Sequence, residues 1–260
     1  MSQSLFQLLF NPRAVALIGA SGDPKKNTSR PQRYLRQYGY AGTILPINPA
    51  RAEVLGEKAY PSVLDVPGEI DHAFIMVPTD AVPAALEQCV AKKVPVVTIY
   101  SDGFAETGGE GRVKQQKLVE IARKGGVRLI GPNCIGLFSS RPACALSVNA
   151  VLEKLNVTPG PLAIVSQSGS MMGGLLSRGL GRGVGFSKLI SVGNECDLGV
   201  GEIAESLVED SHTEAILLFM ETIRGAEHLA RAARAAHAAG KPVIVYKLGR
   251  SSVGQDLAAS

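Results

Sequence analysis

A run of small polar residues at 166–170, SQSGS, is the stretch of this chain whose residue types best suit chemistry. It follows the apolar run 162–165 (LAIV), which is typical of a buried strand, and it precedes a helix-compatible segment. The first N–H groups of a helix lack partners within the helix, and the helix dipole is positive there. Such a turn binds anions, and a glycine lets the ligand approach closely. The sequence therefore predicts an anion site at 166–170, with a purely structural turn as the alternative.

A second turn of this kind spans residues 19–22 (GASG), after the apolar run 14–18. One of the glycines of the G-x-G-x-x-G fingerprint is displaced, so a cofactor phosphate and a plain tight turn both remain open. The next predicted strand ends in Asn48 and Pro49, and Arg51 follows. NAD-dependent enzymes hold the ribose 2′-hydroxyl with an acidic residue at this place, so a nicotinamide-dependent oxidoreductase is disfavoured.

A carboxylate is expected in the same layer as the anion site, because Glu221 directly follows the apolar run 215–220. A nucleophile elbow is excluded, because SQSGS has no glycine two residues before its central serine. The histidines are expected to be surface or capping residues without a metal-ligand spacing, so no metal site is predicted. They are His72, His212, His228 and His237.

Two series of alternating strand-like and helix-like segments must position these residues. The first series has predicted strands at 14–18, 43–47, 73–77, 94–100 and 127–130, with helices at about 28–38, 81–92 and 111–124. The second has strands at 162–165, 186–192, 215–220 and 243–246, with helices at about 170–181, 200–209 and 226–239. This alternation predicts two doubly wound α/β units with parallel sheets, whose ligands bind at the carboxyl ends of the strands.

The pattern lapses between the two series, where prolines accumulate around 142–161. We therefore expect a first domain at 1–140, a linker or arm at 141–160 and a second domain at 161–260. The polar stretch after Lys247 carries no predicted element. The second domain is accordingly expected to be truncated at its C-terminus, unless the stretch is a loose tail.

Composition is that of an ordinary soluble protein, with 45% hydrophobic residues, 19% charged residues and a net charge of +4. No basic run and no aromatic stacking platform favours nucleic acid. The apolar runs are too short to cross a bilayer, and no basic segment precedes the apolar part of the N-terminus, as it would in a secretory signal. We therefore expect a cytoplasmic protein without a membrane partner. The cysteines lack C-x-x-C spacing and are expected to be free, buried or half-buried thiols: Cys89, Cys134, Cys144 and Cys196.

An ordered set of motifs carries a family resemblance over almost the whole chain. The motifs are AVALIGAS, LPINP, HAFIMVP, SDGFAETG and RLIGPNCIG, followed by AIVSQSGSM, ISVGNECD, LLFMETI and PVIVYKLGRS. They resemble the α-type portion of NDP-forming acyl-CoA synthetases, the superfamily of succinyl-CoA synthetase and ADP-forming acetyl-CoA synthetase. The resemblance implies an α/β fold in which a Rossmann-like CoA-binding domain precedes a flavodoxin-like, doubly wound ligase domain.

The reaction implied by the resemblance is acid + CoA + ATP ⇌ acyl-CoA + ADP + phosphate, through an acyl phosphate and a phosphorylated histidine. By the same resemblance, the phosphohistidine would rest on Ser168, Gly169 and Ser170, and Glu221 would accept a hydrogen bond from its other ring nitrogen. Such a carboxylate fixes the tautomer of the ring and supports its positive charge. Coenzyme A would lie on Gly19, Ala20, Ser21, Pro49, Arg51, Val77, Pro78, Ser101, Asp102, Gly103 and Asn133.

The chain departs from the family pattern at two places. The family's histidine follows a K-x-G-R-S stretch and an alanine-rich linker, whereas here KLGRS at 247–251 is followed by no histidine up to Ser260. The chain is therefore expected to bind CoA but to be inactive alone, since the histidine and the ATP-grasp domain that holds ATP and Mg²⁺ are both absent. The second departure is NTSRP at 27–31, where relatives usually have glycines, and it leaves the pyrophosphate contacts open.

An alternative function is a regulatory module that senses CoA or acyl-CoA, as in units fused to protein acetyltransferases. The expected partners of the ligase are a small carboxylic acid, CoA and an ATP-grasp domain or subunit. An oligomer is also expected, since tandem α/β domains with an unfinished sheet edge favour association.

Overall fold

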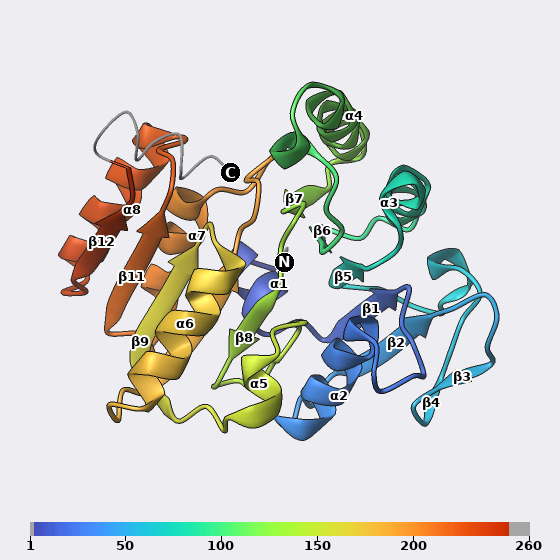
Figure 1. Cartoon of the computed structure of the whole chain (residues 1–260), viewed down its shortest axis with the longest axis horizontal. Coiled ribbons are helices and arrows are strands. Elements are labelled where there is room, and N and C mark those ends of the chain that lie inside the picture. Colours follow the sequence, from blue (N-terminus) through green and yellow to red (C-terminus); the bar gives the residue numbers. More distant parts are fainter. Residues whose placement is uncertain (1–2, 250–260) are drawn as a thin grey trace.

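The computed structural model describes residues 3–249, and its strands form two five-stranded sheets and one two-stranded ribbon (Figure 1). The first sheet is wholly parallel in the order β2-β1-β5-β6-β7. Its strands are β1 (Ala14–Ile18), β2 (Thr43–Ile47), β5 (His72–Ile75), β6 (Val96–Ile99) and β7 (Arg128–Ile130). Figure 1 shows α2 (Arg30–Gln37) on one face of this sheet, with α3 (Val82–Ala91) and α4 (Gly109–Gly125) on the other. The ribbon of β3 (Glu53–Val54) and β4 (Glu57–Lys58) follows β2.

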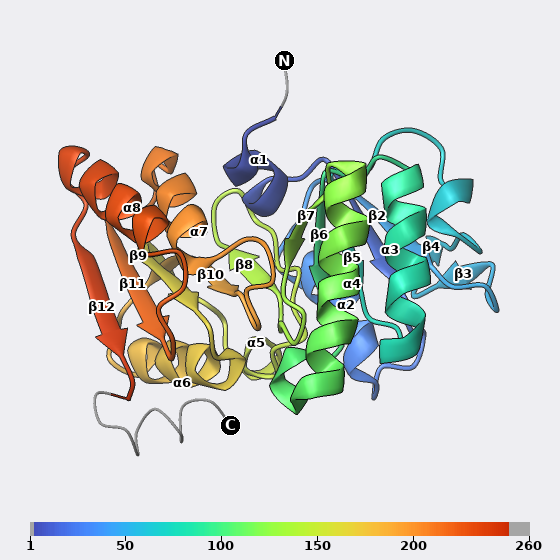
Figure 2. The ribbon, with the colours of Figure 1, turned by 90° about the horizontal axis from the view of Figure 1, so that it is seen from above.

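The second sheet has the order β12-β11-β9-β10-β8. Its parallel strands are β9 (Pro159–Ser166), β10 (Phe186–Ser191), β11 (Ala215–Met220) and β12 (Val243–Lys247). The edge strand β8 (Leu137–Ser139) runs antiparallel to β10. Figure 2 shows α6 (Gly169–Leu180) on one side of the sheet, and α7 (Val200–Ser206) and α8 (Ala226–Ala238) on the other. The short α5 (Val151–Lys154) precedes β9.

Both sheets place their strands in the same way. In each parallel set, the second strand lies on one side of the first strand and the third lies on the other. This reversal of strand order opens a crevice at the carboxyl ends of the first and third strands, where ligands of such folds bind. The crevice lies above β1 and β5 in the first sheet and above β9 and β11 in the second.

The N-terminal helix α1 (Leu5–Phe10) packs between the two halves (Figure 2). The hydroxyl of Ser4 accepts a hydrogen bond from the Gln7 N–H and caps the helix. Leu9 and Phe10 are fully buried, in a hydrophobic cluster that contains residues of both sheets. The two sheets are therefore joined by one continuous core.

The predicted α/β alternation is confirmed, and the strands expected at 14–18, 43–47 and 215–220 have the bounds of β1, β2 and β11. The sequence did not indicate α1, the β3–β4 ribbon, β8 or α5. β8 lies within the first 140 residues but pairs in the second sheet, and the domain boundaries stay a prediction. The expectation about the C-terminal tail falls at 250–260, outside the described residues.

One histidine prediction is wrong. His72 is fully buried in β5, where its ring nitrogens lie 3.1 Å from the Leu8 carbonyl oxygen and 2.8 Å from the Thr98 hydroxyl. Burial lowers the pKa of His72 to about 4, so the ring is neutral at physiological pH. His72 can be a core residue because both of its ring nitrogens have partners there. The sequence shows only that a charged residue, Asp71, precedes it, and this gave no sign of burial.

The cysteines are free thiols, as predicted, with three buried and Cys196 partly exposed. Among the described residues, no helix combines the length and the apolar character that crossing a membrane requires.

A buried ion pair ties β10 to the loops at its amino end. The Lys188 ammonium lies 2.7 Å from Asp210 and donates to the Arg141 carbonyl oxygen at 2.9 Å, and both charged side chains are at least 97% buried. Burial lowers the pKa of Lys188, whereas hydrogen bonds from Lys188 and Thr213 outweigh burial and lower the pKa of Asp210. Each charge therefore depends on its partner for solvation.

Lys188→Met should lower the free energy of unfolding by about 3–5 kcal/mol, because it leaves the Asp210 carboxylate buried without its cation. Urea denaturation measures this loss. Lys114→Met is the matched control, since Lys114 forms an exposed pair with Asp80 and should change stability by less than about 1 kcal/mol. Equal effects of the two substitutions would contradict the structural role of the buried pair.

Candidate functional site

The turn after β1 can only be made by a glycine. Gly19 has φ of +89°, and a Cβ there would lie 2.9 Å from the Met76 carbonyl oxygen and 3.0 Å from a methyl carbon of Val77. Its N–H donates to the Ile47 carbonyl oxygen at 3.1 Å. The backbone of the turn thus passes so close to the end of β5 and the loop after it that no side chain fits at this position.

The loop after β2 joins this turn. Asn48 donates from its side-chain amide to the Ala20 carbonyl oxygen at 2.9 Å. The exposed Arg51 side chain reaches the turn as well, since its guanidinium would lie 3.5 Å from a Cβ on Gly22. Pro49, between them, is exposed. An exposed guanidinium above a glycine turn suits the binding of phosphate groups.

The loops after β5, β6 and β7 continue the same edge. The Ser101 hydroxyl donates to the Val77 carbonyl oxygen, and the Asn133 N–H donates to the Ser101 carbonyl oxygen at 2.9 Å. The Thr79 hydroxyl donates to the Asp102 carbonyl oxygen at 2.8 Å. The structure therefore brings together along one edge all the positions predicted to contact CoA: Gly19, Ala20, Ser21, Pro49, Arg51, Val77, Pro78, Ser101, Asp102, Gly103 and Asn133.

The predicted phosphate turn forms the N-terminus of α6. Ser168 is the N-cap, and its hydroxyl accepts a hydrogen bond from the Met171 N–H at 3.3 Å. Gly169 packs so closely on Ile135 that a Cβ would lie 2.9 Å from that side chain. Ser170 is exposed. The twelve-residue helix thus presents its positive end to solvent at the crevice of the second sheet.

Glu221 lies beside this helix N-terminus, at the end of β11. Partial burial raises the pKa of Glu221, although the Ser168 hydroxyl and the Lys247 ammonium both act to lower it. Lys247, from the end of β12, donates to the Glu221 carbonyl oxygen at 2.7 Å. The structure therefore brings Glu221 and Ser168 together, as expected from their places at the ends of adjacent strands.

The side chain of Gln167 connects the loops of the second sheet, and the sequence did not single it out. Its amide oxygen accepts hydrogen bonds from the N–H groups of Glu221 at 2.6 Å and Thr222 at 2.9 Å. Its amide nitrogen donates to the Thr222 carbonyl oxygen at 2.9 Å and to the Glu195 carboxylate. Gln167 is 7% exposed, so these buried contacts fix the backbone on which Glu221 is carried. The only sequence signal is a glutamine inside a run of serines at a strand end.

A cavity of about 440 Å³ lies between the two edges. Asn27 and Tyr100 line it from the first sheet's loops, while Gly169 and Ser170 line it from the start of α6. Its other lining residues are Ile135, Val148, Asn149, Ala150, Val151, Gly173, Gly174 and Ser177. None of these lining residues carries a charged side chain, so the cavity suits an uncharged or apolar group.

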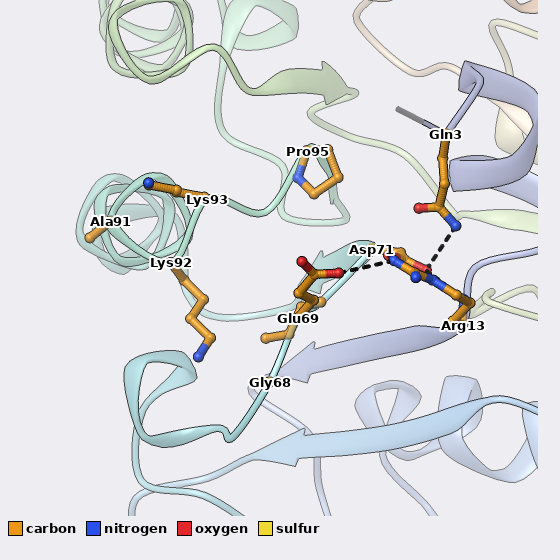
Figure 3. A pocket seen from close by; sticks show the side chains of 10 residues that line it. Gln3, Arg13, Gly68, Glu69, Asp71, Ala91, Lys92, Lys93 and Pro95 are labelled. Carbon is orange, nitrogen blue, oxygen red and sulfur yellow. Dashed lines mark hydrogen bonds and ion pairs between the residues drawn. The ribbon is translucent and has the colours of Figure 1, made fainter. Parts of the chain in front are cut away.

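A second cavity, of about 520 Å³, opens at the opposite edge of the first sheet, before β1, β5 and β6 (Figure 3). Two of its cations have partners: Arg13 contacts Asp71 at 2.7 Å and Glu69 at 3.2 Å. Lys92 donates to the Val66 carbonyl oxygen. A cavity at the amino ends of parallel strands is a poor candidate for a ligand site.

No histidine in the described residues contacts the turn at 168–170. His72 is buried in the first sheet, His212 lies in an exposed turn, and His237 is exposed on α8. His228 lies near Glu202, with 3.7 Å between the ring nitrogen and the carboxylate. Within residues 3–249, no three potential metal-ligand side chains gather in one place.

Two family models match consecutive parts of the chain. A CoA binding domain matches residues 13–140, and a succinyl-CoA ligase like flavodoxin domain matches residues 159–260. The first match contains the edge of the glycine turn, and the second contains the N-terminus of α6 and Glu221.

Known proteins of this kind are similar over nearly all of the chain. The α subunit of acetate–CoA ligase (ADP-forming) I from Pyrococcus furiosus is 42% identical, over 98% of this chain and 55% of its own length. Acetate–CoA ligase (ADP-forming) I from Archaeoglobus fulgidus is 38% identical, over 97% of this chain and 36% of its own length. The structure of dinucleotide-forming acetyl-coenzyme A synthetase 1 from Ca. Korarchaeum cryptofilum superimposes with a TM-score of 0.91 at 34% identity, over 99% of this chain and 55% of that one.

The chain spans about half the length of the first of these relatives and about a third of the second. Its two family-model matches together cover most of its residues. The chain belongs to the NDP-forming acyl-CoA synthetases, as the α-type portion in which a CoA-binding domain precedes a flavodoxin-like ligase domain.

Proposed function

We propose that this chain is the CoA-binding portion of a ligase that catalyses acid + CoA + ATP ⇌ acyl-CoA + ADP + phosphate, through an acyl phosphate and a phosphohistidine. The observation that carries the proposal is the cavity shared by the two edges. Tyr100, next to the predicted CoA residue Ser101, lines it on one side, and Gly169 and Ser170 line it on the other. The CoA thiol, held on one side, and the acyl phosphate, held on the other, would meet in one uncharged cavity. Transfer of the acyl group from the phosphate to the thiol requires this proximity.

Coenzyme A binds along the first edge in this proposal. The close approach of backbone at Gly19 leaves room for the pyrophosphate, and the exposed Arg51 supplies positive charge beside it. The buried Ser101 and the positive-φ Asn133 shape the edge toward Tyr100. These contacts orient the cofactor so that its thiol end faces the cavity.

The phosphoryl group rests at the N-terminus of α6. The N–H groups of Gly169 and Ser170 lie in the first turn, where the helix itself provides no acceptor for them. Glu221 accepts a hydrogen bond from the far nitrogen of the imidazole, which holds the tautomer that phosphoryl transfer needs. The histidine and an ATP-grasp domain or subunit binding ATP and Mg²⁺ complete the enzyme from outside residues 3–249.

The acyl group occupies the uncharged cavity. A second carboxylate, as in succinate, would find no cation on the lining residues, whereas a monocarboxylic acid needs none. We therefore propose a small monocarboxylic acid as the substrate. A cytoplasmic location is supported by the free cysteines. An oligomer is supported by β12, which is an edge strand within the part of the chain that the structure describes.

The isolated chain should bind CoA with a dissociation constant in the range of about 10–1000 μM, measured by calorimetry. Arg51→Ala should weaken binding about tenfold at low salt, since it removes a cation from the pyrophosphate side. Arg123→Ala removes an exposed arginine from the last turn of α4, at the end of the helix far from the loop after β6, and should leave binding unchanged. No heat of binding in that range would refute the CoA site.

Glu221→Gln should slow phosphoryl transfer to the histidine about 100-fold in the enzyme assembled with its ATP-grasp partner, because the amide cannot support the imidazolium charge. In the unsubstituted enzyme, transfer should fall as the pH drops through the raised pKa of Glu221, since the protonated group no longer supplies the negative charge that supports the imidazolium. Transfer of labelled phosphate from ATP measures both effects. The control is Glu227→Gln, which changes an exposed carboxylate of α8. If Glu221→Gln left both the rate and the pH profile of phosphoryl transfer unaltered, the proposed role of Glu221 would be contradicted.

Gly174→Leu should narrow the choice of acid. Gly174 lines the cavity from the middle of α6, and a Cβ there meets nothing within 4 Å, so the longer side chain fills free space without breaking the helix. Acyl-CoA formation from a four-carbon acid should fall at least about tenfold relative to acetate. Gly109→Leu in α4, also with open space at its Cβ, should keep the original ratio. An unchanged ratio in Gly174→Leu would place the acyl group elsewhere.

A further inference from the structure

The turn between β10 and α7 has an unusual backbone. Glu195 has φ of +50°, a left-handed conformation that a residue with a side chain adopts at a cost in free energy. Gly193, also at positive φ, packs against the loop after β7 so closely that a Cβ would overlap the Pro132 carbonyl oxygen. The Asn194 N–H donates to that same oxygen at 2.9 Å. The turn is therefore held against the first sheet by backbone contacts.

The Glu195 carboxylate orients Gln167. One of its oxygens accepts the Val200 N–H at 2.7 Å, at the start of α7, and the other accepts the Gln167 amide nitrogen. Because the two ends of an amide are not interchangeable, fixing the nitrogen on a carboxylate turns the oxygen toward the N–H groups of Glu221 and Thr222. Glu195 thereby acts on Glu221 through one intervening side chain.

Asn194 makes the corresponding contacts toward the CoA edge. Its side-chain amide donates to Glu106 and, at 3.0 Å, to Gln115. Glu106 in turn accepts the N–H groups of Gly103 at 2.6 Å and Phe104 at 3.1 Å. Burial would raise the pKa of Glu106, but the hydrogen bonds from Asn194 and the backbone outweigh it and keep the carboxylate charged. Asn194 is thus one side chain away from the predicted CoA residue Gly103.

We infer that Asn194 and Glu195 are positioning residues, which set the CoA edge through Glu106 and the Glu221 backbone through Gln167 from a single strained turn. The inference rests on the proposed function for the roles of Gly103 and Glu221. The turn ties the loop after β6 to the loop after β9, because Asn194 bonds to Glu106 in the first loop and Glu195 bonds to Gln167 in the second.

Glu195→Gln tests the link to Glu221, since the amide is of equal size but cannot accept from both Val200 and Gln167. In the 260-residue chain, hydrogen exchange of the Glu221 and Thr222 amides should become about tenfold faster. In the assembled enzyme, kcat should fall at least about tenfold, with KM for CoA changed less than about twofold. Asn194→Ala should show the reverse, a raised KM for CoA with the exchange of the Glu221 amide unaltered.

The exchanged pair Gln167→Glu with Glu195→Gln separates positioning from a structural role. It restores a carboxylate–amide contact in the opposite sense, and the new Glu side chain still offers acceptors to the N–H groups of Glu221 and Thr222, while it loses the donation to the Thr222 carbonyl oxygen. Slow amide exchange and most of kcat should therefore return. Glu110→Gln, an exposed carboxylate in the first turn of α4, is the matched control and should change neither reading.

Unchanged exchange at both amides in Glu195→Gln, or no recovery in the exchanged pair, would overturn the inference. If Glu195→Gln alone failed to fold, the exchanged pair would still decide, because its amide exchange is read against the unsubstituted chain. Failure of the proposed function looks different. The unsubstituted chain would then bind no CoA, while the amide exchange would still respond to Glu195→Gln.

Discussion

The buried amide of Gln167 is the interaction on which the candidate site depends. It holds the loop after β11 with its oxygen and the turn after β10 with its nitrogen, while its own backbone belongs to the loop after β9. These three loops carry the helix N-terminus, Glu195 and Glu221. Each end of the Gln167 amide has a partner of the opposite kind, so neither end is left unpaired, and a looser arrangement would be costly.

The topology explains why two separate binding edges face one cavity. Both sheets reverse their strand order beside their first parallel strand, so each opens a crevice at its carboxyl edge. The core that α1 and β8 help to build keeps the sheets in one orientation, and the turn at 193–196 bonds across to the loops after β6 and β7. The fold thus holds the N-terminus of α6 and the edge of the Gly19 turn at a fixed separation.

Local patterns predicted the parts of this fold that local physics decides. The buried strands β1, β2 and β11 are short apolar runs between turn residues, and the anion turn follows from a strand opening onto a helix. The missed elements depend on distant partners. β8 is three residues long and exists because it pairs with β10, and His72 is buried because Leu8 and Thr98 supply partners. Gln167 and Glu195 are polar residues in loops, and only the folded chain shows that each lies against the other.

The central claim is that CoA and the phosphoryl group approach one cavity from two sides. A crystal structure of the chain with bound CoA tests it most directly. The account predicts the pyrophosphate at the Gly19 turn near Arg51, and the thiol end in the cavity between Tyr100 and Gly169. Binding at the other edge of the first sheet, in the cavity beside Arg13, or a thiol end directed away from α6, would contradict it.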